Sequence, residues 1–177
     1  MSTQVIVLNG GSSSGKSGIV RCLQALLPEP WLALGTDGFV EALPAALRRG
    51  ETGIGIGPDG TVTVGPEFRR LEEAWTAGVA AMVRSGARVV VDEVFLGRSA
   101  SQQRWQRALT GLEVLWVGVR CAPEVAAARE LARGDREPGM AARQADLVHQ
   151  GVHYDLEVDS SRVQALDCAR LIAARVR

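Results

Sequence analysis

The chain has 177 residues, of which 46% are hydrophobic, and 20 acidic side chains balance 20 lysines and arginines. This length and apolar content fit one compact domain with a single substantial core. The zero net charge offers no electrostatic footprint for a nucleic-acid partner, and no apolar run approaches the roughly 20 residues that span a bilayer.

The N-terminus and the cysteines bear on cellular location. Residues 1–4 lack the positive leader of a secretory signal, which predicts a cytoplasmic protein. Cys22, Cys121 and Cys168 are far apart and surrounded by apolar residues, so we expect buried free thiols rather than a disulfide or a zinc site. The composition leaves self-association into a homo-oligomer open.

The first apolar run, residues 5–8, leads into a full G-x-x-x-x-G-K-[ST] motif and then into a helix-like segment at 18–23. The motif comprises Gly10, Gly11, Ser12, Ser13, Ser14, Gly15, Lys16 and Ser17. Backbone N–H groups of such a loop and the helix behind it bind phosphate oxygens. Lys16, the only lysine of the chain, is predicted to reach the β- and γ-phosphates, and Ser17 to bind Mg²⁺. The motif therefore predicts ATP and Mg²⁺; the alternative is a glycine-serine turn that contains a lysine by chance.

Further along, strands alternate with helices. Apolar runs predict strands at 31–34, 88–92, 114–119 and 154–158. Helices are expected at 39–48, from residue 66 onward, at 101–109, 123–133 and 161–175, with a small hairpin at 54–56 and 61–64 around the turn 58–60. The pattern predicts an α/β fold, a five-stranded parallel doubly wound sheet of the P-loop, nucleotide-kinase-like type. P-loop kinases of small molecules usually have the strand order 2-3-1-4-5, and the positions below assume that order. We expect one domain over 1–177, with an insertion at about 49–66 and a short lid at about 133–139.

Three acidic residues follow predicted strands, at the edge of the sheet where ligands gather. Asp92 ends an apolar strand beside the first strand, a position that usually holds Mg²⁺. Asp37 lies one strand farther out and is predicted to be the general base that accepts the proton of an acceptor hydroxyl. Glu93 is a candidate for contacting metal or substrate. Turn or helix-capping roles are the alternatives for Asp37 and Asp92.

Arginines near the predicted lid are candidates for contacting the transferred phosphoryl group. Arg133 and Arg136 stand beside glycines 134 and 139, which favour a segment able to open and close. The alternative is a solvated helix face, because every surface cation of this chain is an arginine.

Aromatic and aliphatic residues gather around the acidic turns and on the long helix. Phe39, Trp75 and Phe95 are the candidates for walls of an acceptor pocket, which would suit a neutral alcohol better than a polyanion. Each of them could equally belong to the core.

Several of these segments together resemble the chloramphenicol phosphotransferases of actinomycetes. The similar segments are residues 8–17, 36–39, 91–97, 116–121 and 132–136. The resemblance implies transfer of the γ-phosphate of ATP to the primary hydroxyl of chloramphenicol. It also implies that Asp37 is the acceptor base and that Arg133 and Arg136 are lid arginines. One departure is Asp92-Glu93, which stands where two aspartates are expected.

Three functions follow from these observations. The first is an ATP-dependent kinase of a small alcohol, with chloramphenicol first among the candidates. The second is a housekeeping kinase of a nucleoside, sugar or vitamin precursor, although the pocket candidates are apolar and offer few cations. The third is a regulatory NTPase; a sole lysine in the phosphate loop excludes an Asn-Lys-x-Asp base-reading motif.

Overall fold

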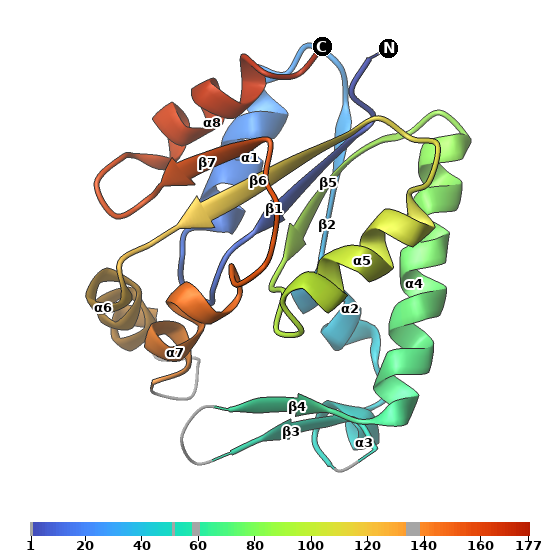
Figure 1. Ribbon diagram of the computed structural model, residues 1–177, viewed down its shortest axis with the longest axis vertical. Coiled ribbons are helices and arrows are strands. Elements are labelled where there is room, and N and C mark those ends of the chain that lie inside the picture. Colours follow the sequence, from blue (N-terminus) through green and yellow to red (C-terminus); the bar gives the residue numbers. More distant parts are fainter. Residues whose placement is uncertain (1, 51, 58–60, 134–138) are drawn as a thin grey trace.

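A five-stranded parallel sheet forms the centre of the molecule in this computed structural model, which describes residues 2–50, 52–57, 61–133 and 139–177 (Figure 1). In spatial order its strands are β2 (Trp31–Gly35), β5 (Arg88–Glu93), β1 (Val5–Asn9), β6 (Val114–Arg120) and β7 (Leu156–Asp159). Numbered along the chain, this order is 2-3-1-4-5, and the predicted sheet is confirmed. The last strand begins at Leu156 rather than at Tyr154.

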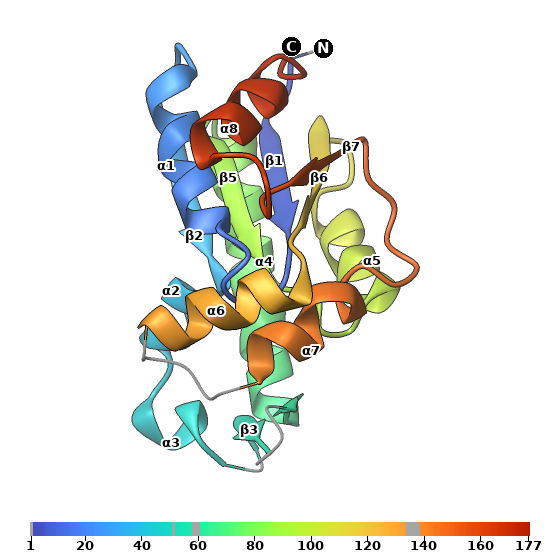
Figure 2. The ribbon, with the colours of Figure 1, turned by 90° about the vertical axis from the view of Figure 1, so that its left-hand side faces the viewer.

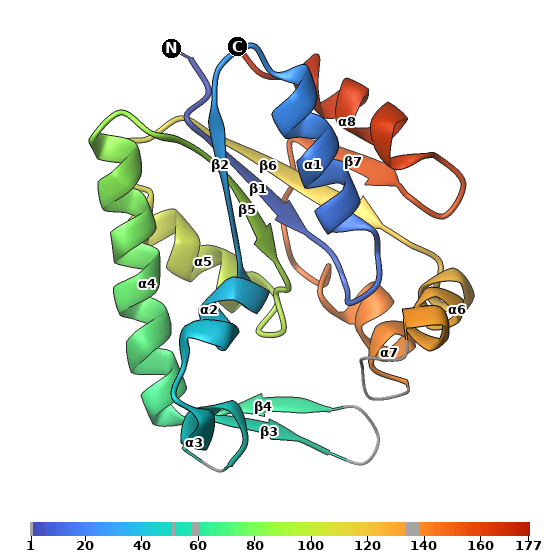
Figure 3. The ribbon, with the colours of Figure 1, turned by 180° about the vertical axis from the view of Figure 1, so that it is seen from behind.

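Helices cover both faces of the sheet (Figures 1 and 3). They are α1 (Lys16–Leu26) and α8 (Ala165–Ala173) on one face, and α4 (Pro66–Arg84) and α5 (Ser99–Ala108) on the other. Successive strand residues point to opposite faces, so Ile6 and Leu8 pack toward α1 and α8 while Val5 and Val7 pack toward α4 and α5. Because each face has its own core, β1 is apolar at every one of these positions.

The segment after β2 forms two short helices, α2 (Thr36–Ala42) and α3 (Ala45–Arg48). The sequence predicts one helix over 39–48, and this prediction is wrong in its start and its continuity. Pro44 holds the preceding Leu43 in an extended conformation, with φ −69° and ψ 147°, and so ends α2. The first helix instead begins directly after β2, which puts Thr36 and Asp37 in its first turn.

Next in the chain, β3 (Ile54–Ile56) and β4 (Val62–Val64) pair antiparallel, as the hairpin prediction requires. The predicted turn 58–60 lies outside the described residues. Ile54 packs with Phe39, Leu43 and Phe68 in a small core of its own.

Two helices lie across the carboxyl ends of the strands, α6 (Pro123–Arg133) and α7 (Met140–Leu147) (Figure 2). The sequence does not predict α7, because the polar segment 134–139 masks its beginning. Gly139 precedes it with φ +90°, a conformation that glycine adopts without strain.

Several further features follow from this packing. Thr3 N–H donates to the carbonyl of Arg177 at 3.0 Å, so the beginning and end of the chain meet (Figure 1).

The three cysteines are free thiols, as expected, although Cys22 is only half-buried. No helix of the described segments has the length and hydropathy that crossing a membrane requires.

Candidate active site

The phosphate loop connects β1 to α1 at the carboxyl edge of the sheet. Ser13 and Gly15 take left-handed backbone conformations, with φ of +58° and +86°. They turn the chain sharply into α1, whose first turn has no acidic residue and no side-chain cap. The N-terminal N–H groups of this helix and its dipole are therefore directed toward an anion at the loop.

Close packing explains the first two glycines of the loop. A Cβ on Gly10 would lie 2.7 Å from the carbonyl oxygen of Val119, and one on Gly11 would lie 3.1 Å from the carbonyl carbon of Gln144. Any side chain at Gly10 would therefore force backbone to move. The loop is built tightly against β6 and α7.

Lys16 and Ser17 both contact Asp92, the next-to-last residue of β5. Lys16 Nζ donates to the carbonyls of Gly10 and Gly11 at 2.9 Å each and lies 3.5 Å from Asp92 Oδ1. Ser17 Oγ donates to Asp92 Oδ2 at 3.1 Å. The strand register, which pairs Leu8 with Asp92, accounts for this meeting. The lysine, the hydroxyl and the carboxylate thus form one cluster.

This cluster fits Mg²⁺ bound together with a nucleotide. A hydroxyl and one carboxylate suffice for Mg²⁺, which usually takes its other ligands from phosphates and water. Within the described segments, no group of three or more His, Cys, Asp and Glu side chains could hold a metal by itself. The buried hydroxyl of Ser13 has no hydrogen-bond partner among the described residues, as expected of a group that awaits an anion.

Glu93 points away from this cluster, on the other side of β5. Only 6% of it is exposed; Trp105 Nε1 donates to its Oε1 at 3.1 Å, and Val94 N–H donates to its Oε2 at 3.0 Å. Burial raises the pKa of Glu93 to about 7, although the hydrogen bonds donated by Val94 N–H and Trp105 Nε1 oppose the shift. A large fraction of this carboxyl is therefore protonated at neutral pH.

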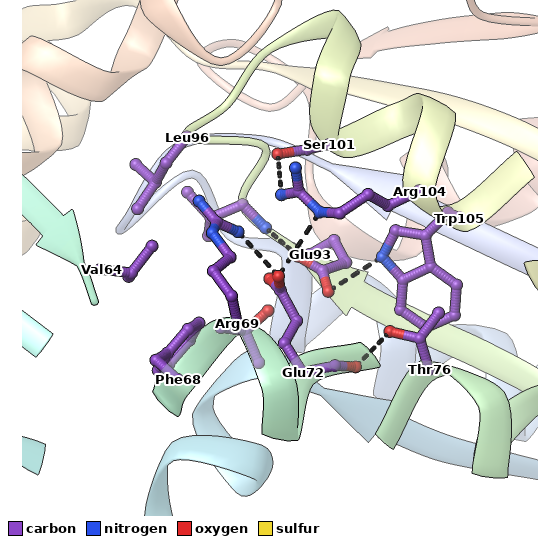
Figure 4. Close-up of a pocket in the computed structure, with 12 residues that line it drawn as sticks. Val64, Phe68, Arg69, Glu72, Thr76, Glu93, Leu96, Ser101, Arg104 and Trp105 are labelled. Atoms are coloured by element: carbon purple, nitrogen blue, oxygen red, sulfur yellow. Dashed lines mark hydrogen bonds and ion pairs between the residues drawn. The ribbon is translucent and has the colours of Figure 1, made fainter. Parts of the chain in front are cut away.

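A pocket opens next to Glu93, between α4, α5 and the end of β5 (Figure 4). It is narrow: its cavity volume is about 40 Å³, and the figure reaches about 460 Å³ only when space open to solvent is counted as well. The residues that line it are Thr36, Val64, Phe68, Arg69, Glu72, Thr76, Glu93, Val94, Leu96, Ser101, Arg104 and Trp105. Two lining residues are chain neighbours of the acidic candidates: Thr36 precedes Asp37, and Glu93 follows Asp92. The pocket therefore lies next to the carboxylates at the phosphate loop.

The pocket contains an ionic cluster that the sequence did not lead us to expect. Glu72 Oε2 accepts from Arg69 Nη1 at 2.7 Å and lies 3.4 Å from Arg104 Nε (Figure 4). Arg104 Nη2 also donates to Ser101 Oγ at 2.9 Å, and burial lowers the pKa of Arg104. This pocket therefore differs from the expected apolar acceptor pocket with few cations. Its apolar wall is joined to two guanidinium groups and a carboxylate.

The three aromatic candidates lie behind the pocket rather than on its surface. Phe39 stacks on Trp75 with ring centroids 5.3 Å apart, and Trp75 meets Trp105 edge-on at 5.5 Å. Phe95 is completely buried in the core, with its N–H bonded to Asn9 Oδ1 at 2.8 Å. Phe95 therefore does not line this pocket, and the prediction that it forms a wall is wrong. Phe39 and Trp75 instead support Trp105, which does line it.

Two of the remaining catalytic candidates, Asp37 and Arg133, lie at the same edge of the sheet. Asp37 is exposed in the first turn of α2, two residues after Gly35, whose register partner is Asp92. Arg133 is exposed in the last turn of α6, and Arg136 lies outside the described residues. Arg129, one turn earlier in α6 than Arg133, donates from Nη2 to the carbonyl of Ser160 at 2.7 Å and approaches Gly15.

Sequence reasoning also missed several residues of the site. Arg69, Glu72 and Thr76 follow one another at three- and four-residue spacing and form a polar stripe on the helix that also buries Val79. That stripe is a signal available in the sequence. Gln144, in contrast, belongs to a helix that the sequence did not predict, and it gave no such signal.

The comparisons with known proteins agree with this geometry. The sequence matches the family described as "Chloramphenicol phosphotransferase-like protein" over residues 3–177, and the chain belongs to that family. A Mycobacterium tuberculosis relative, named "Putative O-phosphotransferase", is 33% identical over 179 residues, which cover 94% of this chain and 79% of the relative.

Two solved structures show the fold. A sugar kinase from a Janibacter species matches with a TM-score of 0.68 and 16% identity, covering 98% of this chain and 95% of the kinase. The tunicamycin resistance protein of Deinococcus radiodurans matches with a TM-score of 0.67 and 19% identity, over 98% of this chain and 95% of that protein. The family and the fold together indicate a phosphotransferase with the nucleotide-binding fold of P-loop kinases.

Proposed function

We propose that the protein transfers the γ-phosphoryl group of ATP to a hydroxyl of a small molecule held in the pocket between α4 and α5. The observation that carries this proposal is the end of β5: Asp92 contacts Lys16 and Ser17, and the next residue, Glu93, lines the pocket. One strand end thus connects a phosphate site with a site for a second molecule, which a hydrolytic NTPase does not require.

In the proposed reaction the acceptor oxygen attacks the γ-phosphorus and gives its proton to the carboxylate of Asp37. The bond between the γ-phosphorus and the bridging oxygen breaks, and ADP leaves. Lys16 would hold the phosphates, and Ser17 and Asp92 would hold a Mg²⁺ ion, which would supply charge neutralisation. Arg133 is the described candidate for stabilising the transferred group, and we retain Arg136 as a second candidate from the sequence.

Chloramphenicol is the acceptor that we propose first. Family membership supports it, and the fold is shared with a protein named for resistance to another antibiotic, tunicamycin. The apolar part of the pocket wall, Val64, Phe68 and Leu96, suits a partly aromatic alcohol.

A metabolic kinase is the second candidate, and the ionic cluster favours it. Arg69, Glu72 and Arg104 offer hydrogen bonds and charge to a polar acceptor such as a sugar.

An acceptor panel tests the proposal. Purified protein with Mg-ATP is assayed for ADP release with chloramphenicol, sugars, sugar acids and nucleosides, and products are identified by a mass increase of one phosphoryl group. We expect release that depends on one acceptor class, and Asp37→Asn should lower its rate by roughly 10²- to 10⁴-fold with little change in ATP affinity.

Glu41→Gln, on an exposed carboxylate of the same helix, is the matched control and should leave the rate unchanged. ADP release at the same rate without any acceptor would contradict the proposal and favour a regulatory NTPase. Full activity of Asp37→Asn would transfer the role of base to Asp92 or Glu93.

A further inference from the structure

The side chain of Gln144 contacts the phosphate loop from α7. Its Oε1 accepts a hydrogen bond from the N–H of Ser12 at 2.8 Å, and only 4% of Gln144 is exposed. The backbone of Gln144 also lies against Gly11, where a Cβ would come within 3.1 Å of it. Gln144 therefore both packs on the loop and satisfies one of its N–H groups.

The beginning of α7 is fixed by a buried carboxylate of α6. Glu130 is 4% exposed, and its two oxygens accept from the N–H groups of Gly139 and Ala141 at 2.8 Å each. A charge-assisted pair of this kind at a helix N-terminus is favoured by the helix dipole as well. Glu130 thus fixes the position of the N-terminal end of α7.

The end of α7 is fixed to the residue that starts the loop. Asn9 Nδ2 donates to the carbonyl of Val148 at 2.8 Å, and Asn9 Oδ1 accepts from the N–H of Phe95 at 2.8 Å. Asn9 is 1% exposed. One buried amide therefore connects α7, the end of β1 and the turn after β5. Helix α7 thus contacts Asn9, directly before the loop, and Ser12 within it.

We propose that Gln144 is a positioning residue for nucleotide binding, through which α7 holds the phosphate loop in the conformation that accepts phosphate. This inference rests on the proposed nucleotide site. A loop whose N–H group has lost its acceptor occupies other conformations, and the affinity for nucleotide falls with the fraction that remains competent. The contact raises affinity without touching the chemistry, so KM for ATP depends on it more than kcat.

The test measures nucleotide binding and needs no acceptor. Gln144→Met keeps the length of the side chain but removes the hydrogen-bond acceptor, and Gln150→Met makes the same change at an exposed position just after α7. By isothermal titration calorimetry we expect Gln144→Met to bind Mg-ADP about tenfold more weakly than the unmodified protein. Gln150→Met should bind within twofold of it.

A merely structural role would lower the melting temperature of Gln144→Met and leave its affinity for Mg-ADP unchanged, and that result would overturn the inference. Amide hydrogen exchange, measured on the unmodified, nucleotide-free protein, is a second test. It does not depend on whether the variant folds. We expect the Ser12 amide to be protected; exchange at the rate of an unfolded chain would also overturn it. Absence of nucleotide binding in the unmodified protein would instead refute the proposed function, and the exchange measurement would still test the contact.

Discussion

Two consecutive acidic residues of β5 have opposite environments. Asp92 faces the phosphate loop, where Lys16 and Ser17 contact its carboxylate. Glu93 faces the other side of the strand and is buried against Trp105. The alternation of side chains along a strand separates them, so one carboxylate is directed at the proposed nucleotide site and the next at the proposed acceptor pocket. Their chemistry should differ accordingly.

The raised pKa of Glu93 predicts a specific pH dependence of stability. Its pKa is about 7 in the folded chain against 4.5 in the unfolded one, so the folded state alone retains the proton between these values. The contribution of Glu93 to the free energy of unfolding is fully present below pH 4.5. It is lost as the pH rises from there through about 7. Relative to Glu93→Gln, the unmodified protein should lose on the order of 3 kcal/mol between pH 5 and 8, measured by urea unfolding.

Two controls isolate this effect. His149 has its pKa lowered to about 4, chiefly by burial, and so contributes an opposite trend below pH 6.5, but both proteins retain it and it cancels in the comparison. Glu73→Gln, an exposed change on α4, should follow the unmodified protein at every pH. Parallel pH profiles for the unmodified protein and Glu93→Gln would show that Glu93 is ionised throughout.

For Asp92 the prediction concerns Mg²⁺. Asp92→Asn removes the negative charge beside Ser17, and we expect it to weaken binding of Mg-ADP by roughly 10- to 100-fold. Binding of ADP in the presence of a chelator should change much less, which provides an internal control in the same titration. An equal loss with and without Mg²⁺ would mean that Asp92 acts through the loop rather than through a metal.

At the scale of elements, the strands were predictable and some helices were not. A strand covered on both faces must be apolar throughout, as β1 is, and this leaves a clear pattern in the sequence. The start of α7 follows a polar segment and depends on Glu130, nine residues upstream of Gly139. Such a contact has no local pattern. The same reason applies to α2, whose start depends on where β2 ends.

The stability of α7 should therefore depend on Glu130. Glu130→Gln replaces a buried carboxylate that accepts two backbone N–H groups, and its amide can accept only one of them well. We expect a loss of about 1–3 kcal/mol in the free energy of unfolding, measured by denaturant titration. Glu124→Gln, an exposed change in the first turn of the same helix, should cost less than about 1 kcal/mol. Equal losses in both variants would mean that Glu130 does not fix α7.

At the scale of the whole molecule, the two halves of the candidate site differ in how far apart their residues lie along the chain. The phosphate loop is one continuous segment, so a motif reveals it, and a carboxylate after a neighbouring strand follows from the order of parallel strands. The pocket draws on α2, β4, α4, β5 and α5 together, and only the fold brings Arg69 and Arg104 to the same wall. Apolar residues near the acidic turns were natural candidates, yet Phe95 was needed for the core.

The composition of the chain permits a test of the phosphate site in the intact protein. Lys16 is the only lysine beside 19 arginines, it is 6% exposed, and its Nζ lies 2.9 Å from two loop carbonyls. A guanidinium group is larger and planar and does not fit this position. Mg-ADP at about 100 times its Kd should stabilise the unmodified protein by about 2.7 kcal/mol, which for a chain of this size corresponds to a rise of roughly 5–10 °C in Tm.

Lys16→Arg should abolish that rise, measured by differential scanning fluorimetry with each variant compared with its own nucleotide-free Tm. The reverse exchange, Arg21→Lys, introduces a lysine at an exposed position of the same helix and should leave the rise intact. Because the two variants exchange the same pair of residue types, a difference between them isolates the position rather than the amino acid. A full rise in Lys16→Arg would mean that any cation suffices at residue 16 or that the nucleotide binds elsewhere.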